Sequence, residues 1–213
     1  MQSDVKPMMR GYLHQAAFFL FLGAGFMLIT LAHTEIGRIA ALIYVGSLTC
    51  LFGTSALYHR PQWGERARLW LRRVDHSSIY FLIAGSATPV FLLAMNPSSG
   101  IKLLWIAWLA ALLGSLKCFF WPTAPRLLNV ILYISAGLIS IPFLSEMKQG
   151  LGTFNVDLLL LGGIIYSAGA FVYAFKRPNP FPKVFGYHEV FHSMVVIAGL
   201  CHFKVIYDLI QKH

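Results

Sequence analysis

The sequence predicts an all-α membrane protein, a bundle of seven transmembrane helices. Hydrophobic residues make up 57% of the 213 residues and charged residues only 12%, and the mean hydropathy is +0.66. Soluble domains carry about 25% charged residues, so this chain is too apolar for that class. Its apolar residues form continuous runs of roughly 20, the length that a helix needs to cross ~30 Å of hydrocarbon. A membrane β-barrel would instead show alternating segments of about ten residues.

Seven such runs follow one another along the chain. We expect transmembrane helices near 12–32, 39–59, 74–95, 101–121, 127–146, 157–175 and 188–210. Turn-forming or charged residues separate them, as Pro122 and Arg126 do between the fourth and the fifth run. Pro89 in the third run and Pro142 in the fifth predict kinks that open a lateral path to lipid, or else serve core packing. No connection is long enough to form a domain, so 1–213 is predicted to be a single transmembrane domain.

The first run has a flank like that of a secretory signal peptide, because Lys6 and Arg10 precede it. The apolar core of a signal peptide is about 7–15 residues long and is followed by a small-residue cleavage site. This run is longer, and no such site follows it. We therefore predict that it is retained as the first helix.

The basic residues predict the orientation of the bundle. The formal net charge is +9, and all but five of the 17 lysine and arginine residues lie at the end of the predicted bundle that carries the N-terminus. Because basic residues favour the cytoplasmic side, we expect the N-terminus in the cytoplasm and the C-terminus outside. The basic segment 60–73 is expected to meet anionic lipid headgroups. Membrane lipids, and not nucleic acid, are the expected partners.

Two histidines one helical turn apart lie at the start of the last run, in His188-Glu189-Val190-Phe191-His192. Side chains at i and i+4 share a helix face about 5–6 Å apart, so both imidazoles can bind one Zn²⁺. In soluble metalloproteases with this spacing, the glutamate is the general base. Glu189, however, follows His188 by about 100° around the helix. We expect Glu189 to point at an adjacent helix or at the headgroups, and a catalytic role for Glu189 is the alternative.

The second and third runs bring further polar residues to the same depth in the membrane. His59 ends the second run, and Asp75 lies at the start of the third. An even-numbered helix ends, and an odd-numbered helix begins, on the side of the N-terminus, so both residues share a membrane face with His188 and His192. The sequence therefore predicts a zinc site with His59, His188 and His192 as ligands and a fourth position open to water, which is the ligand number of a catalytic site.

Asp75 and Ser55 are the predicted catalytic residues. Zn²⁺ lowers the pKa of a bound water to about 7, and Asp75 is expected to act on that water as general base. Ser55 lies one turn before His59 on the same helix face. Three roles are open for Ser55: it orients the water, binds a substrate carbonyl or holds the base.

Other histidines are expected to lie outside the zinc site. His76 is expected in a hydrogen bond between helices. His202 lies about 15 Å beyond His192 along the helix axis, too far to share the metal, and is expected in a buried polar contact. His14 lies near a segment end, where a solvated imidazole is expected.

The motifs around these residues resemble those of a known family. They are Ser55-Ala56-Leu57-Tyr58-His59, Asp75-His76-Ser77-Ser78-Ile79-Tyr80, Ala84-Gly85, Thr88-Pro89, His188-Glu189-Val190-Phe191-His192 and Cys201-His202-Phe203. In order and spacing, over nearly the whole chain, they resemble the bacterial hemolysin III proteins, which are grouped with the progestin and adiponectin receptors and, more distantly, with the alkaline ceramidases. The resemblance implies a seven-helix bundle in the bacterial inner membrane, with zinc held on the cytoplasmic side by the three histidines and with Asp75 and Ser55 beside the bound water.

The expected function is hydrolysis of an amide or ester bond in a lipid-like substrate by a zinc-dependent intramembrane enzyme. The apolar bundle would receive the acyl chain. The bacterial branch takes its name from a reported pore-forming behaviour, so a cytolysin or channel is the first alternative. The far half of the bundle lacks the run of ionisable residues that a hydrophilic channel needs. A zinc ion that only holds the second and seventh helices together is the other alternative. Hormone sensing is not expected, because the chain lacks the long N-terminal soluble domain of the receptors.

Overall fold

The computed structural model describes residues 6–213, which form eight α-helices and a short 3₁₀ helix and contain no strand. These elements are α1 (Tyr12–Thr30), α2 (Glu35–His59), α3 (Glu65–Leu93), α4 (Pro97–Phe120), α5 (Arg126–Gly137), η1 (Ile141–Phe143), α6 (Leu144–Leu151), α7 (Thr153–Phe175) and α8 (Tyr187–Ile210). Seven segments are long and apolar enough to cross a membrane, because α5, η1 and α6 together form one of them. The predicted all-α membrane fold with seven transmembrane segments is confirmed.

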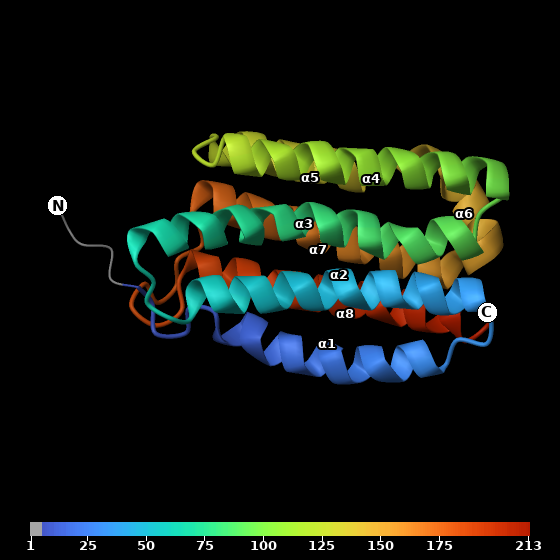
Figure 1. Ribbon diagram of the computed structural model, residues 1–213, viewed down its shortest axis with the longest axis horizontal. Coiled ribbons are helices and arrows are strands. Elements are labelled where there is room, and N and C mark those ends of the chain that lie inside the picture. Colours follow the sequence, from blue (N-terminus) through green and yellow to red (C-terminus); the bar gives the residue numbers. More distant parts are fainter. Residues whose placement is uncertain (1–5) are drawn as a thin grey trace.

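The helices run side by side along one direction (Figure 1). In this view α1 lies at one edge of the bundle and α4 and α5 lie at the other, with α2, α3, α7 and α8 between them. The chain enters the bundle at the end where α2 finishes and where α3 and α8 begin, whereas the C-terminus lies at the opposite end (Figure 1). One end of the bundle therefore gathers the helix termini that carry the predicted site residues.

The third helix is longer than predicted, since α3 begins at Glu65 and not near 74. The charged residues of this segment lie before the apolar run. Because arginine, leucine and glutamate are good helix formers, the helix starts ahead of the apolar region. The Arg73 guanidinium lies over the Trp70 ring, 4.9 Å from its centroid, and this contact joins successive turns of the extension.

The fifth run is not the single helix that was predicted over 127–146. Helix α5 ends at Gly137, and the chain passes through η1 before α6 starts at Leu144. Pro142 lies in η1, where its missing N–H group prevents a continuous α-helical ladder. Pro89, by contrast, lies inside α3 without ending it. The kink predicted at Pro142 is therefore a break in the helix.

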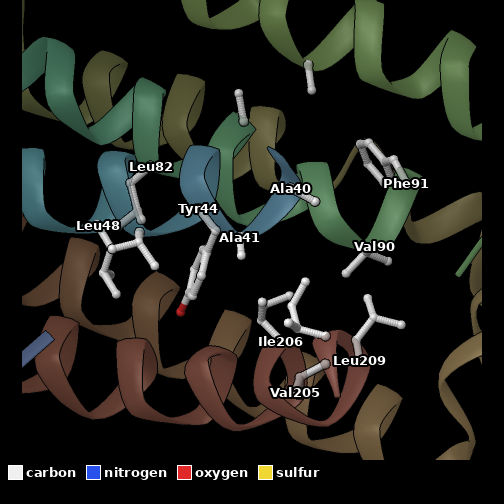
Figure 2. Close-up of a cluster of buried hydrophobic side chains, with 14 of the residues drawn as sticks. Ala40, Ala41, Tyr44, Leu48, Leu82, Val90, Phe91, Val205, Ile206 and Leu209 are labelled. Carbon is white, nitrogen blue, oxygen red and sulfur yellow. The ribbon is translucent and has the colours of Figure 1, made fainter. Parts of the chain in front are cut away.

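Buried apolar side chains of α2, α3 and α8 form part of the core. Figure 2 shows Tyr44 of α2 pointing toward the side of α8 that carries Val205 and Ile206, and all three residues are fully buried. Helices α2 and α3 approach closely at Gly85, where a Cβ atom would overlap the Ser47 side chain. Small residues at such crossings let membrane helices pack backbone to backbone.

Helices α5 and α7 are packed more loosely. Only Asn129 and Val130 are buried in α5. In α7 the buried residues are Asn155, Val156, Gly162 and Gly169. The remaining inward faces of these helices, together with faces of α3 and α8, line a large cavity.

Candidate metal centre

Three histidines meet at the end of the bundle where the chain enters. His59 is the last residue of α2, and His188 and His192 lie in the first two turns of α8. Each offers a ligand nitrogen, and these atoms all lie within 4.8 Å of one another. The Nε2 atoms of His59 and His188 are 3.1 Å apart. Two nitrogens bound tetrahedrally to one ion at ~2.0–2.1 Å are separated by about 3.3 Å, so this buried cluster could hold a metal ion.

The two predicted catalytic residues lie beside this cluster. The carboxylate oxygen Oδ2 of Asp75 is 4.0 Å from Nε2 of His59. The side chain of Ser55 lines the same cavity as Asp75 and the three histidines. Ser55 is itself buried, one turn before His59 on α2. This position is compatible with each of the three roles considered for Ser55.

Glu189 faces away from the histidine cluster. Its Oε2 accepts a hydrogen bond from the backbone N–H of Gly186 at 2.8 Å, which caps the start of α8. Its other carboxylate oxygen forms an ion pair with the Arg10 guanidinium. Glu189 therefore ties the segment before α1 to the start of α8, whereas an adjacent helix or the headgroups were its expected surroundings.

His14 is part of the site, and the prediction of a solvated imidazole is wrong. Its side chain is buried and its ring stacks on that of His192. Helix α1 begins at Tyr12, on the same side of the bundle as the ends of α2 and α8. The argument from helix direction that placed His59 at this end of the bundle also applies to His14, since an odd-numbered helix starts on the side of the N-terminus.

His202 makes the polar contact that was predicted, whereas the hydrogen bond predicted for the His76 side chain is not found among the described residues. The Tyr133 hydroxyl donates to the backbone carbonyl of His76 at 3.2 Å, so the hydrogen bond between α5 and α3 uses the backbone and not the imidazole. Nε2 of His202 lies 3.1 Å from the carbonyl oxygen of Leu159, a partly buried contact between α8 and α7.

A cavity of about 1510 Å³ extends from the histidines into the bundle. Pockets for drug-sized ligands are roughly 300–1,000 Å³, so this cavity has room for a larger molecule. The face of α3 that lines it changes character along its length: Arg72 and Asp75 are followed by Ile79, Ile83 and Val90. The arrangement suits an amphiphile whose polar group lies at the histidines and whose chain lies among the apolar residues.

Comparison with known proteins identifies the family to which this chain belongs. The family model described as "Haemolysin-III related" matches residues 3–203. The chain is 33% identical to the Hemolysin-3 homolog of Bacillus subtilis over 154 residues, which cover 72% of this chain and 69% of that protein. It is 30% identical to Hemolysin-3 of Bacillus cereus over 158 residues, covering 74% and 69% of the two chains. A more distant relative, the Adiponectin receptor protein of Drosophila melanogaster, is 24% identical over 92% of this chain and 49% of its own length. The chain therefore belongs to the haemolysin-III-related family of integral membrane proteins, which also includes adiponectin-receptor-like proteins.

Proposed function

We propose that this protein is a zinc-dependent intramembrane hydrolase that cleaves an amide or ester bond of a lipid-like substrate. The observation that carries the proposal is the position of the Asp75 carboxylate, 4.0 Å from a histidine of the candidate metal centre and at the wall of a large cavity. Three imidazoles with room for a further ligand are typical of catalytic zinc sites. Structural zinc sites usually have four protein ligands.

When bound, Zn²⁺ polarises a carbonyl and lowers the pKa of water. The carboxylate of Asp75 takes a proton from the attacking water while the water oxygen bonds to the carbonyl carbon. Asp75 then returns this proton to the leaving nitrogen or oxygen as the C–N or C–O bond breaks. Ser55, which lines the same cavity, orients the water, binds the substrate carbonyl or holds the base. The products are a fatty acid and an amine or alcohol.

The depth of the cavity supports an acyl substrate. From Asp75 to Val90, both of which line it, α3 rises about 22 Å at 1.5 Å per residue. One leaflet contributes ~15 Å to the hydrocarbon core, so the cavity accommodates an acyl chain of ordinary length. The relatives from Bacillus lead us to infer a bacterial inner membrane. Because most basic residues lie at the end of the bundle that carries the N-terminus, we infer that the metal centre is on the cytoplasmic side.

The test is fatty-acid release by purified protein in liposomes that contain an N-acyl or an acyl-ester lipid. We expect zinc-dependent release that falls at least about 100-fold in Asp75→Asn, which lacks the general base, and is lost in His188→Ala. His33→Ala, at an exposed position at the opposite end of the bundle, should retain it.

Two other outcomes would replace the proposal. Dye leakage that survives both substitutions, without fatty-acid release, would establish a pore and reject the hydrolase. If metal removal only lowers the melting temperature, with neither lipid turnover nor leakage, the ion holds α2 and α8 together and has no catalytic role.

A further inference from the structure

Two arginines of α3 line the mouth of the cavity beside the candidate metal centre. Arg68 and Arg72 are four residues apart, and Asp75 follows three residues later, so the three side chains share a helix face. Arg72 precedes Asp75 by about 4.5 Å along the helix axis. A molecule that reaches Asp75 along this face passes both guanidinium groups.

Lys6 adds a third positive charge from the segment before α1. Its ammonium group donates to the backbone carbonyl of Arg60 at 3.0 Å, and the side chain lines the same cavity. Burial and the positive charges of Arg10, Arg60 and Arg68 lower the pKa of Lys6 below its ordinary 10.5. The cations at this mouth are therefore close enough to repel one another.

These charges lack acidic partners within residues 6–213. Arg10 pairs with Glu189, but neither Arg68 nor Arg72 forms an ion pair there. Asp75 is the only acidic residue among those described that line the cavity. The preference of cytoplasmic loops for basic residues explains cations on the outer surface. It does not explain cations that line a cavity leading to a metal centre.

We propose that Arg68, Arg72 and Lys6 bind the phosphate of an anionic acyl lipid, so that the substrate class of the hydrolase is a phosphate-bearing lipid. The inference rests on the proposed function and names the substrate of the same site. The planar guanidinium of arginine matches two phosphate oxygens at once. In a glycerol lipid a short glycerol unit joins the phosphate to the acyl ester, so a phosphate held by Arg72 leaves the carbonyl near Asp75 and the chain in the apolar cavity.

The test is equilibrium binding to the full-length chain carrying Asp75→Asn, in an uncharged detergent, so that the ligand is not consumed. The probes are 1-oleoyl lysophosphatidate, 1-oleoylglycerol with the same chain but no phosphate, and inorganic phosphate. We expect the lysophosphatidate to bind at least about tenfold more tightly than the other two. Oleoylglycerol lacks the hydrogen bonds of the phosphate to charged groups, and inorganic phosphate lacks the chain that is buried in the apolar cavity. Arg72→Gln and Arg68→Gln should each weaken its binding about tenfold and leave oleoylglycerol binding unchanged.

Matched variants keep the result interpretable. Arg66→Gln removes an exposed cation of the same helix end that does not line the cavity, so it should have no effect. Arg72→Lys keeps the positive charge but loses the planar guanidinium. Its affinity for the lysophosphatidate should therefore lie between those of Arg72→Gln and the parent chain. Equal affinity for the two lipids, or an equal loss in Arg66→Gln, would overturn the inference. If inorganic phosphate binds as tightly as the lysophosphatidate, the mouth is a site for free phosphate and the lipid assignment is wrong.

The two proposals can fail separately. Fatty-acid release by the wild-type protein without any preference for the phosphate probe would leave the hydrolase intact and reject the phosphate site. A preference abolished by Arg72→Gln, in a protein that releases no fatty acid, would support the phosphate site and reject the hydrolase.

Discussion

His14 of α1 stacks face to face on His192 of α8, with ring centroids 3.6 Å apart and ring planes 9° from parallel. Histidines that bind metals usually donate their second ring nitrogen to a carboxylate, carbonyl or water, which fixes the ring. Within residues 6–213, Nδ1 of His192 has no such partner. Among the described residues, the His14 ring is the flat surface against which the His192 ring packs, and we expect this contact to orient His192.

Replacing His14 tests this arrangement through metal affinity. His14→Ala should weaken zinc binding about tenfold, the lower end of the effect of residues that orient metal ligands, because the His192 ring then rotates freely. His14→Phe keeps a flat ring and should retain most of the affinity. Competition with a chromogenic chelator measures both. An unchanged affinity in His14→Ala would show that the stacking does not position His192.

Metal analysis tests the ligand set. The purified protein should contain zinc, and His59→Ala should lose most of it because two imidazoles remain where catalytic sites have three protein ligands. A chelator should lower the melting temperature of the wild type, since an ion bound by the three histidines would join α2 to α8, but not that of His59→Ala. His33→Ala is the control. Full zinc occupancy in His59→Ala would place the metal elsewhere.

Glu189 and Asp75 should separate stability from catalysis. Glu189→Gln leaves the Arg10 guanidinium without its buried partner and should cost about 3 kcal/mol of stability, with zinc content and residual hydrolysis retained in the folded fraction. Asp75→Asn should keep the melting temperature close to that of the wild type while hydrolysis is lost. Thermal unfolding measures the stability of each variant, and fatty-acid release measures its hydrolysis. Loss of hydrolysis in folded, zinc-loaded Glu189→Gln would assign the base role to Glu189 instead.

The levels of the site residues were predictable from the sequence, but their rotation about the helix axes was not. Alternating helix direction is enough to bring His59, Asp75, His188 and His192 to one end of the bundle. It does not determine which neighbour each side chain faces, so the stacking of His14 on His192 was missed. The ion pair of Glu189 with Arg10 was also not predicted. Arg10 precedes the first helix, so its position depends on how the chain enters the bundle.

The differences in helix bounds have a related cause. Hydropathy detects the lipid-crossing part of a helix and not the helix itself, so the charged first turns of α3, from Glu65, were left out of the prediction. Within α5 and α6 the opposite error occurred. The apolar run continues through Pro142, while the helix does not.

Gly85 provides a test of whether α2–α3 packing sets the geometry at Asp75. A Cβ at Gly85 would overlap Ser47, which is buried and hydrogen-bonded to the Tyr44 carbonyl at 2.8 Å. Gly85→Ala should therefore push the two helices apart and cost about 1–3 kcal/mol of stability, as overpacking does. Because Asp75 is on α3 and His59 is on α2, hydrolysis should fall too.

Gly46→Ala is the matched control, since a Cβ at this neighbouring position on α2 meets nothing within 4 Å. It should be neutral or stabilise the helix by up to about 1 kcal/mol. Adding Ser47→Gly to Gly85→Ala removes the overlapping side chain and should recover both stability and hydrolysis. Unfolding in mixed detergent measures the stability of each variant, and fatty-acid release measures its hydrolysis. Recovery of stability without recovery of hydrolysis would mean that the spacing of α2 and α3 does not control the position of the Asp75 carboxylate.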